Sequence, residues 1–360
     1  MLSARAAIRA LPTYHPPLAG RDGLRLDFNE NTVGCSPRVL ECLRSINPEQ
    51  LARYPEREPA ERAVAEFLGV TPEETLLTNG VDEGVHLLCQ TYLEPDDEVL
   101  IVVPTYAMYK IYAVATGARV IEIPAGECFQ FPTEDVLSRI TPRTRLIAVA
   151  NPNNPTGALV PPEDLLRIAR SAPQAALLVD EAYFEFCGQT ILPFRGEIPN
   201  LFVARTFSKV YGLAGLRIGV LIGGAQQMQF VRLAGSPYSV NAIALACLPD
   251  AIADQDYILR YVSEVCAARE LLQDTLQSLA VPHWPSHANF VLARFNMPDL
   301  PLSLRRRGIL VRDRSADYGC HGCIRMTLGP RAYTEKLLAA LRETLPQPAV
   351  APAQPQGAAR

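Results

Sequence analysis

The sequence predicts an α/β fold with a large domain, whose mainly parallel sheet is covered by helices on both faces, and a smaller α+β domain. Between residues 75 and 222, apolar runs of strand length alternate with stretches of helix length. Runs that are apolar at nearly every position are typical of strands buried on both faces, as in parallel sheets. After about residue 238 a long helical stretch is followed by more widely spaced strands, which predicts the second domain.

The composition is that of an ordinary globular chain and excludes several classes of function. The 360 residues are 48% hydrophobic and 20% charged, which is enough chain for two domains. A net charge of −4 gives no basic field for nucleic acid. The sequence contains no apolar run of about 18 residues, the length that a membrane-spanning helix needs. We expect a cytoplasmic protein, because residues 1–11 lack the continuous apolar segment of a signal peptide.

The nine cysteines predict reduced thiols, because their number is odd and they are scattered along the chain. Cys320 and Cys323 enclose His321 and Gly322, a spacing that also occurs in zinc sites. Such a site needs a second ligand pair at suitable spacing, and the sequence offers none. We therefore predict no metal, and the sequence assigns no role to this cysteine pair.

Residues 1–49 are expected to form an N-terminal arm and part of the smaller domain. Prolines 12, 16 and 17 argue against helix in the first 25 residues. Ser36 followed by Pro37 predicts a helix start, and Gly69 is expected to end a second helix over residues 59–68. The loop between the two helices carries Tyr54 without apolar neighbours of the kind found in a core.

Residues 50–245 are expected to form the large domain. Strands are predicted at residues 75–78, 98–103, 119–123, 145–150, 175–179, 201–205 and 216–222. Helices are expected between them, for example from Asn79 to about Leu93 and over 162–170. In such sheets ligands bind beyond the carboxyl ends of the strands. The polar residues at those ends are therefore the candidates for a site.

Residues 246–345 are expected to form the smaller domain, and residues 346–360 a disordered tail rich in Pro, Ala and Gln. The helical stretch after residue 238 should run to about residue 280, with a break at Pro249. Further strands are predicted at 289–294, 309–312 and 324–327, with helices at 300–307 and 331–345. The N-terminal segment is expected to complete this domain.

The stretch from Thr206 to Arg217 follows an apolar strand and carries a single lysine, Lys209. Nothing around this lysine repeats at helical spacing, so it does not belong to a solvated helix face. A lysine held in a fixed site is suited to act as a Schiff-base nucleophile. Thr206, Ser208 and Arg217 provide hydroxyl groups and a planar guanidinium group for a phosphate. Taken alone, the stretch also fits an ordinary surface lysine.

Asp180 comes at the end of the strand predicted at 175–179, after four apolar residues. A buried carboxylate needs a partner, and the protonated ring nitrogen of pyridoxal phosphate is such a partner. The helix that opens at Val81 and Asp82 offers backbone N–H groups to the phosphate. Further contacts to the cofactor are expected from side chains at neighbouring strand ends: Tyr106 stacking on the ring, and Asn154 and Tyr183 bonding its phenolic oxygen.

Together these motifs resemble the fold-type I, class I/II pyridoxal-phosphate aminotransferases over residues 12–345, and most of all the histidinol-phosphate aminotransferase family. The matching segments include L-D-F-N-E-N at 26–31, N-G-V-D-E-G at 79–84, N-P-N-N-P-T-G at 151–157, V-D-E-A-Y at 179–183, R-T-F-S-K at 205–209 and C-I-R-M-T-L-G at 323–329. Each motif alone is weak, but in this order, and each at a strand end, they are specific.

The resemblance implies a role for each matched residue. Lys209, Asp180 and Tyr183 would be catalytic, with Lys209 bound to the cofactor as a Schiff base and then acting as acid and base. The remaining cofactor contacts would come from Tyr54, Val81, Asp82, Glu83, Tyr106, Asn154, Thr206, Ser208 and Arg217. Substrate contacts would come from Tyr14, Asn29, Arg312 and Arg325. Tyr54 would reach into the neighbouring subunit, which implies a homodimer with shared active sites.

Two segments depart from the family pattern on the substrate side, at residues 15–18 and 32–35. The implied reaction is the exchange of an amino group between histidinol phosphate and 2-oxoglutarate, giving imidazole-acetol phosphate and glutamate, in histidine biosynthesis. Two alternatives share the scaffold: an aromatic or broad-range amino-acid aminotransferase, and a decarboxylase of a phosphorylated amino acid. A ligand-sensing module of a bacterial regulator is disfavoured, because only some 25 residues precede the first matched motif.

Overall fold

A computed structural model describes residues 2–9, 11, 13, 20 and 22–345. It contains two sheets. The larger has seven strands in the order β2-β8-β7-β6-β5-β3-β4. Strand β8 pairs antiparallel with both of its neighbours, and the other pairs are parallel. The strands are β2 (Thr75–Thr78), β3 (Glu98–Val103), β4 (Arg119–Pro124), β5 (Thr144–Ala150), β6 (Ala176–Asp180), β7 (Leu201–Thr206) and β8 (Gly219–Gly223).

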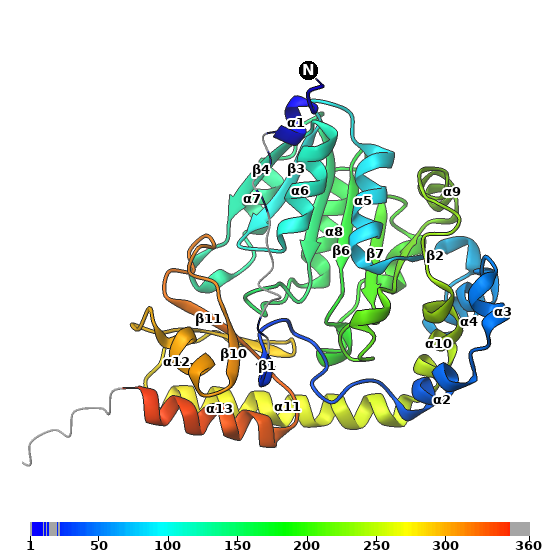
Figure 1. Cartoon of the computed structure of the whole chain (residues 1–360). Coiled ribbons are helices and arrows are strands. Elements are labelled where there is room, and N and C mark those ends of the chain that lie inside the picture. Colours follow the sequence, from blue (N-terminus) through cyan, green and yellow to red (C-terminus); the bar gives the residue numbers. More distant parts are fainter. Residues whose placement is uncertain (1, 10, 12, 14–19, 21, 346–360) are drawn as a thin grey trace, which may run out of the picture.

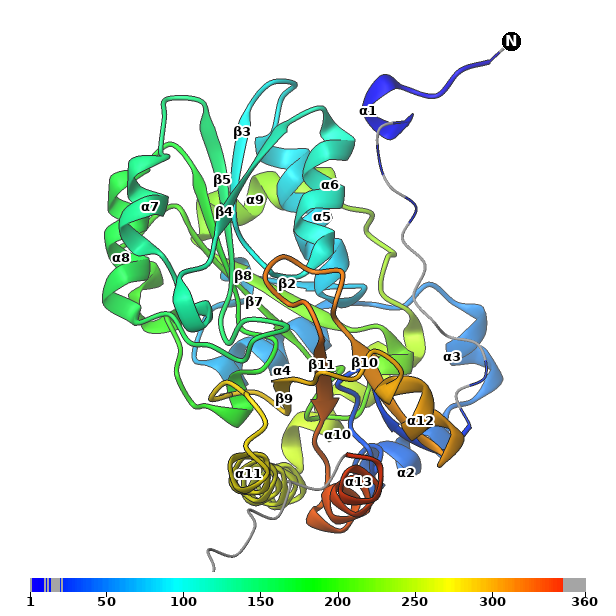
Figure 2. The ribbon, with the colours of Figure 1, turned by 90° about the vertical axis from the view of Figure 1, so that its left-hand side faces the viewer.

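Helices cover both faces of this sheet (Figure 2). Along β5, Ile147 belongs to the core under α8 (Pro162–Ser171), whereas Leu146 and Ala148 belong to the core under α5 (Gly80–Tyr92) and α6 (Ala107–Thr116). Successive side chains of a strand point to opposite faces, so a central strand must be apolar at every position. The predicted mainly parallel, doubly covered sheet is confirmed.

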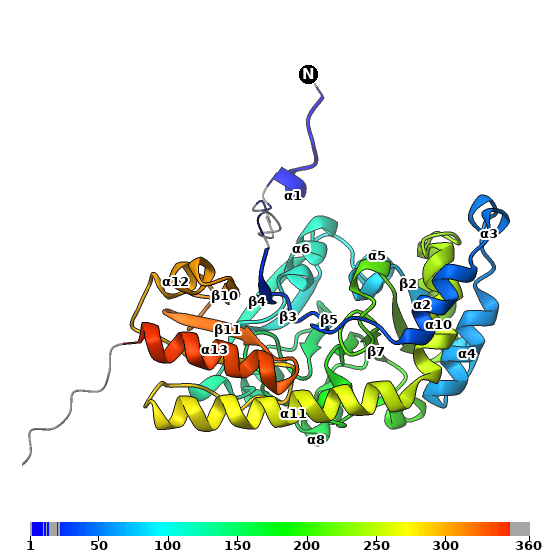
Figure 3. The same cartoon turned by 60° about the horizontal axis from the view of Figure 1, so that its bottom comes forward.

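The smaller sheet has four strands in the order β1-β10-β11-β9, and its first strand comes from the N-terminal segment. These strands are β1 (Leu24–Leu26), β9 (Phe290–Arg294), β10 (Ile309–Asp313) and β11 (Cys323–Thr327). Strand β1 runs parallel to β10, and the other pairs are antiparallel. The long helix α11 (Gln255–Ser278) and α13 (Arg331–Thr344) lie side by side below this sheet (Figures 1 and 3). The predicted domain boundaries at residues 49/50 and 245/246 stay predictions.

The remaining helices are α1 (Ala6–Arg9), α2 (Pro37–Ser45), α3 (Pro48–Ala52), α4 (Glu58–Leu68), α7 (Thr133–Ser138), α9 (Ala225–Ala234), α10 (Ala242–Ala253) and α12 (Leu300–Arg306). Ser36 caps α2 by accepting a hydrogen bond from the Arg38 N–H group, and Gly69 ends α4 in a left-handed conformation, as the sequence predicted. The single turn of α1 lies in the arm that we expected to be irregular. The predicted disordered tail and prolines 12, 16 and 17 lie outside the described residues.

The expected helix break at Pro249 is wrong. Pro249 lies inside α10, and the break comes at Asp254. A proline removes one backbone hydrogen bond, but α10 buries Leu245 and Leu248 against the core, which favours a continuous helix. Asp254 accepts a hydrogen bond from the Tyr257 N–H group and so begins α11. The side-chain cap, and not the proline, therefore marks the boundary.

Candidate active site

A cavity of about 610 Å³ is lined by strand ends of the large sheet and by residues of the small sheet. Most of the predicted site residues line it: Asn29, Val81, Asp82, Tyr106, Asn154, Asp180, Tyr183, Thr206, Ser208, Lys209, Arg217, Arg312 and Arg325. Tyr54 and Glu83 are not among the described residues that line it. Tyr14 lies outside the described residues. Apart from these three, the structure brings the predicted residues together.

Lys209 follows β7, and its ammonium group points into this cavity. Its Nζ donates a hydrogen bond to the Phe28 carbonyl oxygen at 3.1 Å. Burial lowers the pKa of Lys209 from 10.5 to about 8, and the nearby positive charge of Arg325 acts in the same direction. A substantial fraction of the amine is therefore neutral near that pH, as a nucleophile or a base must be.

Asp180 ends β6 and is 5% exposed. Its Oδ2 accepts a hydrogen bond from the Tyr109 hydroxyl at 2.6 Å, and its Oδ1 accepts one from the Ala182 N–H group at 3.0 Å. Burial raises the pKa of Asp180 from 3.8 to about 6, although both hydrogen bonds act to lower it. Tyr109 itself is completely buried. The site therefore holds a carboxylate that a cationic partner would stabilise.

The sequence analysis missed Tyr109. Tyr109 lies in the first turn of α6, three residues after Tyr106, which is the N-cap residue of this helix. The two rings pack edge to face with centroids 5.6 Å apart. The closeness of Tyr109 to Tyr106 in the sequence was the available signal.

The first turn of α5 offers its N–H groups to the same cavity. Asn79, at the N-cap position, makes no capping side-chain bond within the described part of the chain. Arg217 lies beside this turn and forms an ion pair with Asp82 at 3.1 Å. Gly80 has a φ of 75°, a backbone conformation that favours glycine, and a Cβ atom there would also meet the Arg217 Nη2 atom at 2.6 Å. Arg217 has a left-handed backbone, so β8 starts at Gly219 and not at the predicted residue 216.

Tyr183 and Asn29 form the floor of the cavity. The Asn29 Nδ2 group donates to the Tyr183 hydroxyl oxygen at 2.9 Å, and the Thr327 hydroxyl donates to Asn29 Oδ1 at 3.0 Å. Asn29 has a positive φ of 54°, a conformation that asparagine tolerates better than most residues. Burial raises the pKa of Tyr183, which keeps its hydroxyl protonated as a hydrogen-bond donor.

Three arginines form the wall that comes from the small sheet. Arg325 on β11 is 5% exposed and donates to Asn154 Oδ1 and to the Asp27 carbonyl oxygen, both at 2.6 Å. Its Nε atom is buried and has no hydrogen-bond partner among the described residues. Arg312 pairs in register with Arg325 across β10 and β11. A buried donor without a partner suits an anionic ligand.

The third arginine, Arg314, and its ion-pair partner Asp317 also line the cavity but were absent from the predicted site. The Arg314 side chain is 16% exposed. Arg314 directly follows β10, so the alternation of side chains along that strand does not extend to it, and no local pattern predicted it.

Tyr54 and Glu83 lie elsewhere. Tyr54 is 78% exposed, and its ring packs on that of Tyr238 with centroids 4.4 Å apart. The Glu83 carboxylate accepts hydrogen bonds from the Asn79 N–H group and the Ser239 hydroxyl. The prediction that Glu83 contacts the cofactor is not supported by this placement. Val81 and Asp82 occupy the second and third positions of α5 and face the cavity, whereas Glu83 is rotated away from it.

The residues of this cavity fit pyridoxal phosphate by their chemistry. An uncapped helix N-terminus beside Arg217 suits a phosphate, the buried Asp180 suits a protonated ring nitrogen, and Lys209 has the lowered pKa of a nucleophilic amine. No cluster of three or more His, Cys, Asp or Glu side chains that could hold a metal ion occurs among the described residues. The helices in the described part of the chain include none that is long and apolar enough to cross a membrane.

Comparison with known proteins identifies the family. The sequence profile described as aminotransferase class I and II matches residues 21–341. The chain belongs to this family. It is therefore a pyridoxal-phosphate-dependent aminotransferase of small amino and keto acids, and the predicted fold class, enzyme class and cofactor are confirmed.

Among relatives, the chain is 36% identical over 333 residues to the histidinol-phosphate aminotransferase of Caldanaerobacter subterraneus subsp. tengcongensis, covering 89% of this chain and 93% of that one. It is 37% identical over 317 residues to that of Paracoccus denitrificans, covering 86% of each. Among solved structures, histidinol-phosphate aminotransferase from Sinorhizobium meliloti in complex with pyridoxal-5'-phosphate aligns with a TM-score of 0.85 and 26% identity. That alignment covers 94% of this chain and 96% of that one.

Proposed function

We propose that this aminotransferase exchanges an amino group between histidinol phosphate and 2-oxoglutarate, giving imidazole-acetol phosphate and glutamate, as a step of histidine biosynthesis. The observation that carries the proposal is the arginine wall beside Lys209, in a chain whose curated relatives include histidinol-phosphate aminotransferases across 86–89% of its length. Arg312 and Arg325 offer guanidinium groups to a phosphate ester at this end of the cavity, whereas Arg314 is paired with Asp317.

Pyridoxal phosphate supplies an electrophilic carbonyl carbon and a ring that withdraws electrons. Its phosphate would be held by the first N–H groups of α5, by Arg217 and by the Thr206 and Ser208 hydroxyls. The Asp180 carboxylate would hold the protonated ring nitrogen. With a pKa of about 6, Asp180 is mostly ionised at neutral pH. The Tyr109 hydroxyl donates a hydrogen bond to this carboxylate and so orients it.

Lys209 would act as the base that removes a proton from the α-carbon of the amino acid. Its protonated form would then act as the acid that gives the proton back. Its lowered pKa, about 8, lets both the neutral and the charged amine be present under ordinary conditions. Its hydrogen bond to the Phe28 carbonyl oxygen holds the amine beside the N-terminal segment. Arg325 would orient the substrate through its anionic group.

The proposal includes a homodimer with shared sites in the cytoplasm. Tyr54 is exposed on a loop outside its own cavity, which suits a residue that enters the site of a second copy. A reducing compartment is supported by the cysteines, all nine of which are free thiols in the described part of the chain. Mixing inactive Tyr54→Phe and Lys209→Ala subunits should restore activity, because one site of each heterodimer then receives both intact residues.

Steady-state kinetics on the purified enzyme test the substrate directly. With 2-oxoglutarate as acceptor, histidinol phosphate should be turned over with a kcat/KM at least about 10-fold above that for phenylalanine, because one charge-assisted bond corresponds to that factor or more. A preference for phenylalanine would identify an aromatic aminotransferase instead. Release of carbon dioxide from a phosphorylated amino acid would identify a decarboxylase.

A further inference from the structure

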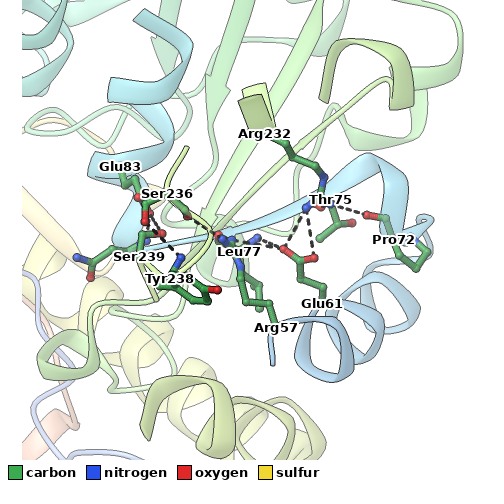
Figure 4. A network of polar contacts seen from close by, with 11 residues as sticks. Arg57, Glu61, Pro72, Thr75, Leu77, Glu83, Arg232, Ser236, Tyr238 and Ser239 are labelled. Atoms are coloured by element: carbon green, nitrogen blue, oxygen red, sulfur yellow. Dashed lines mark hydrogen bonds and ion pairs between the residues drawn. The ribbon is translucent and has the colours of Figure 1, made fainter. Parts of the chain in front are cut away.

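A second cluster of buried charge lies where β2, α4 and the end of α9 meet (Figure 4). Glu61 on α4 is 6% exposed and faces Arg57 Nη2 at 3.4 Å and Arg232 Nη1 at 3.3 Å. The Leu77 N–H group donates to Glu61 Oε1 at 3.1 Å. A buried carboxylate satisfied in this way is costly to disturb. The cluster therefore joins β2, α4 and α9 rigidly.

Arg57 connects this cluster to an exposed loop, residues 236–239, between α9 and α10. Arg57 Nη1 donates to the Ser236 carbonyl oxygen at 3.3 Å, and Nη2 donates to the Leu77 carbonyl oxygen. The Arg57 side chain is 15% exposed, and the residue immediately precedes α4. Tyr54 lies three residues before it. One anchor therefore holds both the Tyr54 loop and the start of the 236–239 loop.

Glu83 provides a second anchor at the other end of the 236–239 loop (Figure 4). The Ser239 hydroxyl donates to Glu83 Oε2 at 2.9 Å, and the same oxygen accepts from the Asn79 N–H group at 2.5 Å. Asn79 directly precedes α5, whose first turn lines the active-site cavity. The loop is thus tied to the helix end that would bind the cofactor phosphate.

Tyr238 lies between the two anchors, and its ring packs against Tyr54 at 4.4 Å. Both residues are largely exposed, Tyr54 at 78% and Tyr238 at 56%. An aromatic pair contributes only about 0.5–1.5 kcal/mol beyond its buried area. Two exposed rings would therefore not hold one conformation without the anchors at either end of the loop.

We propose that Glu83 and Arg57 are positioning residues that act through the 236–239 loop to hold Tyr54 where it enters the partner subunit's site. The inference rests on the proposed function, in which Tyr54 serves the site of a second copy. Under this proposal, Glu83 of one subunit acts on the active site of the other subunit. Glu83 belongs to the helix that lines its own cavity, yet its effect should appear in the other one.

The first test compares two substitutions in the holoenzyme. Glu83→Ala removes the acceptor for Ser239 and Asn79. It should lower kcat/KM and the affinity for pyridoxal phosphate by about 5-fold, the effect expected from losing the one hydrogen bond, to Ser239, that anchors the loop. Glu83→Gln keeps an acceptor oxygen at the same place and should recover most of that loss. Equal values for the wild type and Glu83→Ala would overturn the proposal.

The second test locates the defect by means of heterodimers purified with two different affinity tags. In the first heterodimer, a Glu83→Ala subunit is joined to a Lys209→Ala subunit. Its one working site combines Lys209 of the first subunit with Tyr54 of the second, whose Glu83 is intact, and should match the corresponding site of a dimer with wild-type Glu83. In the second heterodimer, a wild-type subunit is joined to a subunit with both substitutions. Its working site receives Tyr54 from the subunit without Glu83 and should show the loss of about 5-fold.

The reverse result, a defect only in the first heterodimer, would show that Glu83 acts within its own site, and a defect in both would show a general structural role. Either result overturns the proposal. Failure of the proposed shared site looks different, because Tyr54→Phe and Lys209→Ala subunits would then not complement each other at all. Failure of the proposed substrate would appear as a preference for phenylalanine and would leave the heterodimer results unchanged.

Discussion

The two walls of the active-site cavity are held in different ways. The wall from the large sheet presents Lys209 and Asp180 at the ends of adjacent strands, and the contacts of Asp180 come from nearby elements of the same sheet and its helices. The wall from the small sheet presents arginines that depend on distant segments. Arg325, for example, bonds to the carbonyl oxygen of Asp27, 298 residues away. Asp180 is thus held by the large sheet and its helices. Arg325 depends on how the N-terminal segment docks, and so does the Lys209 amine, which donates to the Phe28 carbonyl oxygen.

The largest expected effect comes from removing the catalytic lysine of the wall from the large sheet. Lys209→Ala should lower turnover by about 10³-fold or more, because it removes both the nucleophile and the base. Lys110→Ala is the matched control, since Lys110 is exposed and paired with Glu122 at 2.9 Å. Turnover of both amino donors should fall together in the Lys209 variant. A selective loss of one donor would contradict the division between the walls.

A change in the wall from the small sheet should affect one substrate more than the other. Arg312→Ala should raise the KM for histidinol phosphate by about 10- to 100-fold, the effect of one charge-assisted bond to phosphate. The KM for glutamate should change much less if Arg325 holds its carboxylate. Arg306→Ala, which replaces an exposed arginine at the end of α12, should change neither. Equal shifts for both donors would show that Arg312 does not discriminate.

Asp180→Asn should lower kcat by more than about 10-fold, because an amide cannot stabilise a protonated ring nitrogen by charge. Near-normal activity would place the ring elsewhere.

The same substitution should stabilise the cofactor-free protein at high pH. The folded pKa of Asp180, about 6, lies above the ordinary 3.8, so the folded state binds the proton more tightly. Stability is then lost as pH rises from 3.8 through about 6, by an amount on the order of 3 kcal/mol. The amide of the variant cannot ionise, so the gap in Tm between variant and wild type should widen in favour of the variant as pH rises from 3.8 through about 6 and should be constant above that range. An unchanged gap would mean that Asp180 is not desolvated.

Tyr109→Phe should have the smallest effect, about 3- to 10-fold on kcat/KM, because it removes one hydrogen bond and leaves the ring in place. The Tyr109 hydroxyl lowers the pKa of Asp180, so its loss should raise that pKa and move the acidic limb of the pH profile upward. Tyr112→Phe on the same helix is the control, since the Tyr112 ring stacks on His86 instead. A uniform loss at every pH would indicate a packing defect only.

The sequence was sufficient for the wall from the large sheet because its signals are local. Asp180 and Lys209 each follow an apolar run that defines a strand, and parallel strands bring their carboxyl ends together. Tyr109 was missed because burial of a tyrosine depends on how α6 packs. Glu83 does not line the cavity as Val81 and Asp82 do, because one step along a helix rotates a side chain by about 100°. The helix break expected at Pro249 was wrong, because packing of α10 against the core outweighs the one hydrogen bond lost at the proline.

Only part of the wall from the small sheet was predicted, and the reason is physical. Arg312 and Arg325 face each other through the register of β10 and β11, and the strand that completes this sheet comes from the opposite end of the chain. No local pattern encodes that docking. Arg314 and Asp317 lie on the loop that follows β10. There the course of the loop backbone, and not the alternation of side chains along a strand, decides where the two side chains point.

The most direct test of the account is to identify the lysine that carries the cofactor. The chain has three lysines, Lys110, Lys209 and Lys336, so reduction of the holoenzyme with borohydride followed by peptide mapping gives an unambiguous answer. The account predicts the pyridoxyl group on Lys209, in full and alone. Its appearance on Lys110 or Lys336 would contradict the assignment of the cavity and of every role derived from it.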